Sequence, residues 1–166
     1  MIDLTILIPV YNEEATILEI LGHVAEQKID DVRLQVLVVD DGSTDETTEM
    51  LQKAKGRDSR IRIIRTSANG IVSALNTGLA ECKGNYIARM DADDRMEKTR
   101  LEKQLEMMIQ NPELDLIGCR VEGFTDSGIF PESGIQYQSW SNSLISHEQI
   151  AGDLFAESPI VHPTFF

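Results

Sequence analysis

Two short apolar runs constrain the fold of this chain more than any other feature. LTILIP at residues 4–9 and LQVLVV at residues 34–39 are almost free of polar side chains. Runs of this length are typical of strands that are covered on both faces, as in a parallel sheet. Parallel neighbours need a crossover connection, so the two runs predict strands joined by helices.

The residues between and after these runs have helical spacing. We expect the first helix to begin after an N-cap at Asn12. Its apolar stripe is predicted at Ile17, Leu18, Leu21 and Val24. STDE at residues 43–46 predicts a capping box, in which Ser43 and Glu46 bind each other's free amides at the start of a second helix.

The alternation continues in the second half of the chain. IRIIR at residues 61–65 predicts an edge strand, and YIARM at 86–90 and LDLIGCRV at 114–121 predict two more strands. Two further helical stripes are expected, at Ile71, Leu75, Leu79 and Cys82, and at Leu101, Leu105, Met108 and Ile109. Gly84 and Asn85 would close the first in a left-handed cap, and Pro112 would stop the second. The whole order predicts an α/β fold with an open, doubly wound, mostly parallel sheet and helices on both faces.

The pattern decays from Glu122 onward. Residues 123–143 are rich in Gly and Ser and predict a long surface loop. SHEQ at residues 146–149 predicts the cap of a last short helix. Cys82 and Cys119 lie in apolar segments without a CxxC spacing, which favours two reduced core thiols.

A formal net charge of −13 limits the partners of the chain. Nucleic acid and anionic membrane surfaces both attract basic proteins, so we expect no nucleic-acid partner. The longest apolar runs fall far short of the ~20 residues of a membrane-spanning helix. The first residues lack the features of a secretory signal, so we expect a cytoplasmic protein, compatible with peripheral association at the inner face of the cell membrane. An acidic protein that binds a phosphate compound needs a cation.

Three polar clusters follow predicted strands, at residues 11–14, 40–43 and 91–94. Ligands of open α/β sheets bind at the carboxyl ends of the strands, so the topology would gather these clusters at one cleft. Each has a structural alternative: a turn with a cap, a tight turn before a helix, or a solvated acidic loop. However, Asp91, Asp93 and Asp94 raise each other's pKa unless a positive group lies among them, and a hard divalent cation would meet that need.

Four segments in this order and spacing carry a family resemblance. They are ILIPVYNEEATILEIL, VLVVDDGSTDET, NGIVSALNTGLAECKGNYI and MDADD. Together they resemble the nucleotide-sugar-binding half of the family 2 inverting glycosyltransferases, which have the GT-A fold. RLEKQLEMMIQNPELDLIG and the terminal HPTFF are similar to bacterial members that build surface polysaccharides. The resemblance runs from Thr5 to the last residue and is weakest between residues 122 and 149.

The resemblance implies a metal-dependent transfer reaction. A sugar would move with inversion from a nucleotide sugar, in our reading a UDP-sugar, to a hydroxyl of a saccharide or lipid-linked acceptor in bacterial cell-surface polysaccharide synthesis. Asp91 and Asp93 would be the DxD pair that holds Mn²⁺ or Mg²⁺. Asp93 is the expected direct ligand, and Asp91 would contact the metal or the ribose. Oxygen ligands suit these hard ions.

The resemblance also implies the residues that bind the nucleotide. Asp41 would accept a hydrogen bond from N3–H of uracil, and the Tyr11 ring would stack on the base. Pro9 and Glu13 would flank that ring, and Asp40 is expected to contribute to the nucleotide site as well.

The resemblance predicts an incomplete enzyme. Residues 1–121 would form the donor-binding region, and residues 122–166 would start an acceptor-side region. The base that deprotonates the acceptor usually follows the HPT-like segment in this family, so it is expected beyond Phe166. Asp94 is a less favoured candidate for that base.

Two other functions share part of this evidence. The chain could be a module that binds a nucleotide sugar and transfers nothing. VVDDGST also resembles the D-x-D-G-T motif of aspartate-nucleophile phosphatases, but Val39 stands where that motif needs a carboxylate.

Overall fold

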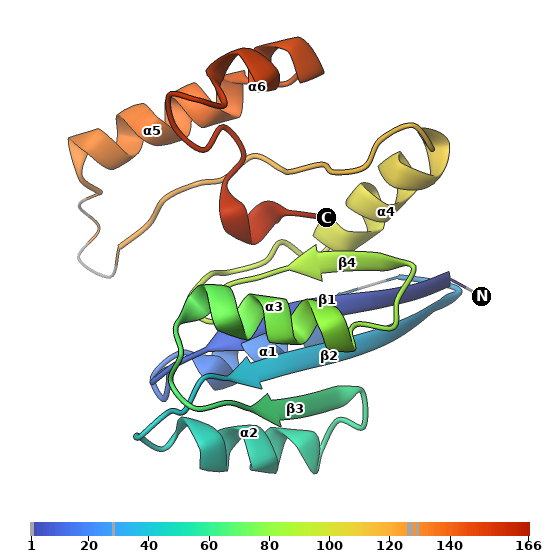
Figure 1. Cartoon of the computed structure of the whole chain (residues 1–166), viewed down its shortest axis with the longest axis vertical. Coiled ribbons are helices and arrows are strands. Elements are labelled where there is room, and N and C mark those ends of the chain that lie inside the picture. The colour runs from blue at the N-terminus through green and yellow to red at the C-terminus, as the bar shows by residue number, and fades with distance from the viewer. Residues whose placement is uncertain (1, 28, 126–127, 129) are drawn as a thin grey trace.

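A single parallel sheet organises the computed structural model, which describes residues 2–27, 29–125, 128 and 130–166. Its strands are β1 (Ile2–Val10), β2 (Val32–Asp40), β3 (Ile61–Arg65) and β4 (Tyr86–Arg89). The strand order is β3-β2-β1-β4, and every pair is parallel (Figure 1). The edge position predicted for residues 61–65 is confirmed.

Helices cover both faces of the sheet, which confirms the doubly wound α/β fold. α1 (Ile17–Ala25), α2 (Thr47–Lys55) and α4 (Arg100–Gln110) share one apolar cluster with even-numbered residues of β1 such as Ile6. α3 (Ile71–Glu81) lies on the other face (Figure 1). Its Ala74 packs in a second cluster with Leu7, Leu37 and Val39. Alternation of side chains along β1 produces this division.

The start of α1 differs from the prediction. Thr16 precedes the helix, and Asn12 lies earlier in the chain with a φ of 56°. Ile20 is buried in place of Leu18, which is about half exposed. The reason is geometric, because a buried face follows the spacing i, i+3, i+4, i+7 from Ile17, and Leu18 is off that face.

The capping box predicted at residues 43–46 is wrong. α2 begins at Thr47, and Glu46 in the N-cap position makes no side-chain cap. The Ser43 hydroxyl instead accepts the backbone N–H of Asn12 at 3.0 Å. A partner from the loop after β1 has therefore replaced the local one.

The stripe predicted on α3 is also displaced. Ala74 and Gly78 are its buried residues, whereas Ile71 and Leu79 are half exposed. The helix ends at an extended Cys82, and the positive φ angles of the described residues do not include Gly84 or Asn85. Gly84 is needed for another reason, because a Cβ there would lie 2.8 Å from the backbone nitrogen of Thr5.

The helix α4 follows its prediction closely. Leu101, Leu105 and Met108 are buried, Ile109 is half exposed, and the helix ends before Asn111. Both cysteines are free as expected, but Cys119 is exposed and is not a core residue.

The last part of the chain differs most from expectation. Residues 114–121, all within the described part of the chain, form no strand. The HPTFF segment takes the place beside β4: the Arg89 N–H donates to the Phe165 carbonyl at 2.8 Å, and Ile117 pairs in turn with Phe166 through two bonds of 3.0 and 3.1 Å. The HPTFF segment therefore lies between LDLIGCRV and β4, and LDLIGCRV does not pair with β4 directly.

The predicted surface loop contains a helix, α5 (Glu132–Ser143). Its apolar residues do not repeat on one face, and Ser141 is its buried residue, so periodicity could not reveal it. α6 (His147–Asp153) confirms the cap at SHEQ, since Ser146 and Gln149 bind each other's backbone N–H groups. A 3-10 turn, η1 (His162–Thr164), precedes the last two residues. None of the described helices is long and apolar enough to cross a membrane.

Candidate functional site

A cleft of about 520 Å³ opens at the carboxyl ends of β1, β2 and β4. The chain leaves β1 toward β2 on one side and later returns to β4 on the other, so the cleft lies where the strand order reverses. Six of the predicted site residues line it: Pro9, Tyr11, Glu13, Asp41, Asp91 and Asp93. Asp40 and Asp94 are not among the residues that line the cleft.

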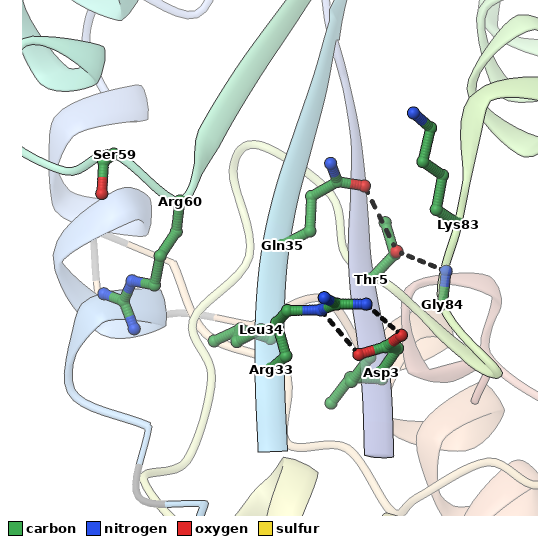
Figure 2. Close-up of a pocket in the computed structure, with 10 residues that line it drawn as sticks. Asp3, Thr5, Arg33, Leu34, Gln35, Ser59, Arg60, Lys83 and Gly84 are labelled. Carbon is green, nitrogen blue, oxygen red and sulfur yellow. Dashed lines mark hydrogen bonds and ion pairs between the residues drawn. The ribbon is translucent and has the colours of Figure 1, made fainter. Parts of the chain in front are cut away.

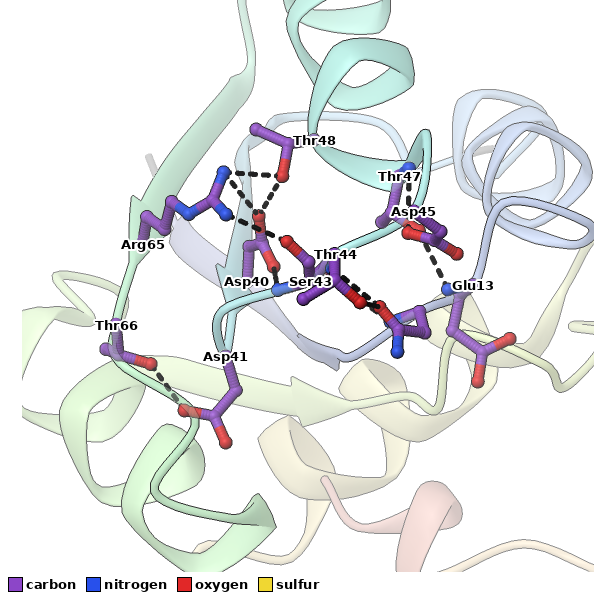
Figure 3. Close-up of polar contacts among 11 residues, drawn as sticks. Glu13, Asp40, Asp41, Ser43, Thr44, Asp45, Thr47, Thr48, Arg65 and Thr66 are labelled. Atoms are coloured by element: carbon purple, nitrogen blue, oxygen red, sulfur yellow. Dashed lines mark hydrogen bonds and ion pairs between the residues drawn. The ribbon is translucent and has the colours of Figure 1, made fainter.

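The loop after β1 presents the Tyr11 side chain to this cleft, with about half of its surface exposed. The loop is tied to the start of α2 by hydrogen bonds between segments about 30 residues apart. Thr44 N–H donates to the Asn12 side-chain oxygen at 2.8 Å. Glu13 N–H donates to the Thr47 hydroxyl at 2.8 Å (Figure 3). These bonds fix the backbone that directly follows the exposed ring.

Asp40 points away from the cleft toward α2 and β3. Its carboxylate is fully buried and accepts the Ser43 N–H at 2.8 Å and the Thr48 hydroxyl at 2.7 Å (Figure 3). Arg65 lies 3.8 Å from the same carboxylate and also donates to the Ser43 carbonyl. Both oxygens of Asp40 are therefore engaged in holding the turn after β2.

Asp41 points the other way and organises the entry to α3. Its carboxylate accepts the Thr66 hydroxyl at 2.6 Å and the N–H groups of Asn69 at 3.0 Å and Gly70 at 2.6 Å. The bond from Thr66, visible in Figure 3, is the main reason why the pKa of Asp41 lies below its ordinary value. Gly70 has a φ of 88°, which an L side chain would rarely adopt.

The three carboxylates after β4 form one cluster. Oxygens of Asp91, Asp93 and Asp94 all lie within 4.8 Å of one another. Asp93 is exposed and the other two are partly buried. Burial, followed by the charges of Asp91 and Asp93, raises the pKa of Asp94 to about 6. Oxygens this close from three acidic side chains are ligands that suit a hard divalent cation.

A buried arginine at the end of β4 was missed by the sequence analysis. Arg89 forms a bidentate ion pair with Asp91, with one nitrogen-to-oxygen distance of 2.9 Å and a second, closer contact. Burial still outweighs this pairing and raises the pKa of Asp91. The signal was available, because residues i and i+2 of an extended chain share one face.

The C-terminal segment brings His162 to the same region. Its ring packs against Phe165 in a tilted arrangement, with centroids 4.4 Å apart. Burial lowers the pKa of His162, and the charge of Arg89 adds to that effect.

A second cavity, of about 370 Å³, lies at the opposite end of the strands (Figure 2). Arg33 and Asp3 form a bidentate ion pair there, with distances of 2.8 and 2.5 Å. Thr5 links Gln35 to the Gly84 N–H. None of the predicted site residues lines this cavity.

Comparison with known proteins assigns this chain to a family. The model of glycosyl transferase family 2 matches residues 5–166. An uncharacterized glycosyltransferase of Haemophilus influenzae is 32% identical over 96% of this chain and 50% of its own length. The chondroitin synthase of Escherichia coli is 30% identical over 88% of this chain and 21% of its own. The chain spans between 33% and 50% of the length of the first bacterial relatives that it matches.

Solved structures resemble the fold. TarS of S. aureus in complex with UDP-GlcNAc superposes with a TM-score of 0.67 at 24% identity, over 78% of this chain and 37% of TarS. A mannosyltransferase from Pyrobaculum calidifontis in complex with GDP-Man and Mn²⁺ has a TM-score of 0.65 at 28% identity, over 72% of this chain and 35% of its own.

Proposed function

Because the chain belongs to glycosyl transferase family 2 and has the GT-A fold, we propose that its cleft binds a nucleotide-sugar donor together with a divalent cation. The sugar would pass with inversion to a hydroxyl of a saccharide or lipid-linked acceptor in bacterial surface polysaccharide synthesis. The observation that carries this proposal is that Tyr11, Asp41 and two members of the acidic cluster, Asp91 and Asp93, line one cleft. The similarity to a chondroitin synthase supports the proposed role in polysaccharide synthesis.

The nucleoside would occupy the end of the cleft between Tyr11 and Asp41. Tyr11 offers an exposed ring for stacking on the base. The Oδ2 oxygen of Asp41 accepts the Gly70 N–H, and a carboxylate oxygen has two lone pairs. That oxygen can therefore accept N3–H of uracil in a cleft that Pro9 and Glu13 also line. We revise the role of Asp40 from binding the nucleotide to positioning the loop that carries Asp41.

The diphosphate would lie against the acidic cluster. Asp93 is the proposed direct ligand of Mn²⁺ or Mg²⁺ because it is exposed, and Asp91 would contribute from its paired position. A cation held there supplies the positive charge that stabilises a departing nucleoside diphosphate. The mannosyltransferase solved with GDP-Man and Mn²⁺ supports this proposal.

The group that deprotonates the acceptor stays a prediction. A positioned base contributes about 10²–10⁴-fold to such a step. Asp94 remains the candidate within the chain, but it lies outside the lining of the cleft and against its acidic neighbours. We therefore still place the base beyond Phe166. Tight donor binding without sugar transfer would favour the alternative of a binding module.

The metal assignment is tested by the affinity for UDP. We expect UDP to bind at least about tenfold more tightly with Mn²⁺ than with a chelator, because the cluster alone repels the diphosphate. Asp93→Ala should remove most of this difference, whereas Asp115→Ala, an exposed aspartate outside the cleft, should preserve it. Titration calorimetry on the three proteins measures the effect. Equal UDP affinity with and without metal in the wild-type protein would contradict the assignment.

The choice of base is tested by competition among nucleotides. Cytosine presents an acceptor at N3, where uracil presents a donor, so CDP should bind more weakly than UDP beside Asp41. GDP is the third competitor, because the mannosyltransferase neighbour was solved with GDP-Man. A preference for GDP or CDP would reject the uracil contact and leave the family unaffected.

A further inference from the structure

Arg89 is a buried cation beside an acidic cluster. It is 6% exposed, and its Nε is buried with no hydrogen-bond partner in the described part of the chain. Its backbone is held on both sides: the N–H donates to the Phe165 carbonyl at 2.8 Å, and the carbonyl accepts from Arg100 at 3.0 Å. The backbone that carries the Arg89 guanidinium is therefore fixed in place.

The ion pair with Asp91 controls both orientation and charge. A bidentate pair aligns the guanidinium and carboxylate planes and is stronger than a single contact. Each Asp91 oxygen keeps a further lone pair, and Asp91 lines the cleft. By contrast, no ion pair holds Asp93 or Asp94 among the residues that the structure describes. One of the three carboxylates is thus neutralised by direct contact.

We propose that Arg89 is a positioning residue that holds the Asp91 carboxylate at the cleft and neutralises the negative charge that Asp91 would otherwise add to the cation site. This inference rests on the proposed function. The cation site is then less negative than three carboxylates alone would make it. Such a site binds a free cation weakly, because less negative charge attracts it. The same site binds a cation together with a nucleoside diphosphate well, because less negative charge repels the phosphates.

The test separates the affinity for the metal from the affinity for the nucleotide. In Arg89→Met, which keeps the side-chain length and removes the charge, we expect Mn²⁺ alone to bind about five- to tenfold more tightly. UDP at saturating Mn²⁺ should bind about tenfold more weakly. Free Mn²⁺ is measured by electron paramagnetic resonance, and UDP by calorimetry. A purely structural arginine would not produce changes of opposite sign.

Two controls accompany this variant. Arg33→Met removes the same charge from another bidentate arginine–aspartate pair, at the far end of the strands, and should leave both affinities unchanged (Figure 2). Arg89→Lys keeps the charge and loses the fork, so its Mn²⁺ affinity should stay near the wild-type value. If Arg89→Met does not fold, the unfolding of Arg89→Lys in combination with Asp91→Asn tests the ion pair instead.

The pair itself is tested by thermal unfolding of Arg89→Lys, Asp91→Asn and the double variant. The double variant should lose less in Tm than the sum of the single losses, because both changes break one contact. Additive losses would overturn the inference. Unchanged affinities in Arg89→Met, or a parallel loss of both, would overturn it while the proposed function stands. If the wild-type protein binds neither Mn²⁺ nor UDP, the proposed function and the inference fail together.

Discussion

At the scale of single residues, adjacent aspartates have different surroundings. The alternation of an extended chain turns Asp40 toward α2 and Asp41 toward α3 and the cleft. The Asp40 carboxylate accepts hydrogen bonds from the turn after β2 and does not line the cleft. Asp41 accepts three hydrogen bonds and also lines the cleft. The same alternation places Arg89 beside Asp91.

Asp41 should contribute to stability in a way that depends on pH. Its folded-state pKa is lowered from an ordinary value of 3.8, chiefly by the Thr66 hydroxyl. The contribution is therefore complete above the unfolded-state pKa and is lost as the pH falls through the lower, folded-state value. Asp41→Asn should lower the free energy of unfolding by about 1–3 kcal/mol at pH 7. The difference from wild type should shrink below pH 3.8.

Urea unfolding of both proteins at pH 7 and at pH 3 measures that difference. Asp115→Asn is the control at an exposed position. A destabilisation by Asp41→Asn that is the same at both pH values would contradict the role of the ionised carboxylate.

At the scale of elements, α3 is placed by small residues. Gly78 lets the helix approach the sheet, since a Cβ there would lie 2.2 Å from a methyl carbon of Leu7 and 3.1 Å from one of Val39. Leu7 and Val39 are buried and have little room to move. The close approach brings the start of α3, and with it Gly70, to the wall of the cleft.

Two glycine-to-alanine changes in helices should have opposite effects. Gly78→Ala should reduce the free energy of unfolding, because overpacking costs about 1–3 kcal/mol and exceeds the gain in helix propensity. Gly22→Ala in α1 meets nothing within 4 Å and should raise the free energy of unfolding by about 0.5–1 kcal/mol. Chemical denaturation of both variants decides the matter. A stabilised Gly78→Ala variant would show that α3 can move away from the sheet at little cost.

At the scale of the whole molecule, the C-terminal segment completes the surroundings of β4. Phe166 is buried, its ring lies tilted against Tyr86 with centroids 5.9 Å apart, and its backbone pairs with that of Ile117. The Gln104 side chain of α4 donates to the Thr164 carbonyl at 2.9 Å. These contacts join the end of the described chain to β4 and α4 and bring His162 near the acidic cluster.

Two phenylalanines near the C-terminus test this closure. Phe166→Ala should lower the free energy of unfolding by about 3 kcal/mol, because a buried aromatic side chain is removed. Phe155 is 97% exposed, and Phe155→Ala should change it by no more than about 0.5 kcal/mol. Thermal and urea unfolding provide the comparison. Equal effects of the two substitutions would mean that the segment does not pack against β4 in solution.

The sequence by itself determined the parallel sheet, the positions of its first two strands and the gathering of polar clusters at their carboxyl ends. It could do so because burial on both faces produces unbroken apolar runs, and because parallel topology brings strand ends together. The capping box at Ser146 was equally readable, since its two members lie three residues apart and bind each other.

Only the tertiary structure decided which partner each polar side chain would take. Ser43 is a residue type that often caps a helix locally, yet its hydroxyl accepts the backbone N–H of Asn12, 31 positions away. α5 has no apolar face to reveal it, and HPTFF displaces the expected strand at residues 114–121 from β4. In each case a contact distant in sequence competes with a local one, and a pattern of near neighbours carries no information about such a competitor.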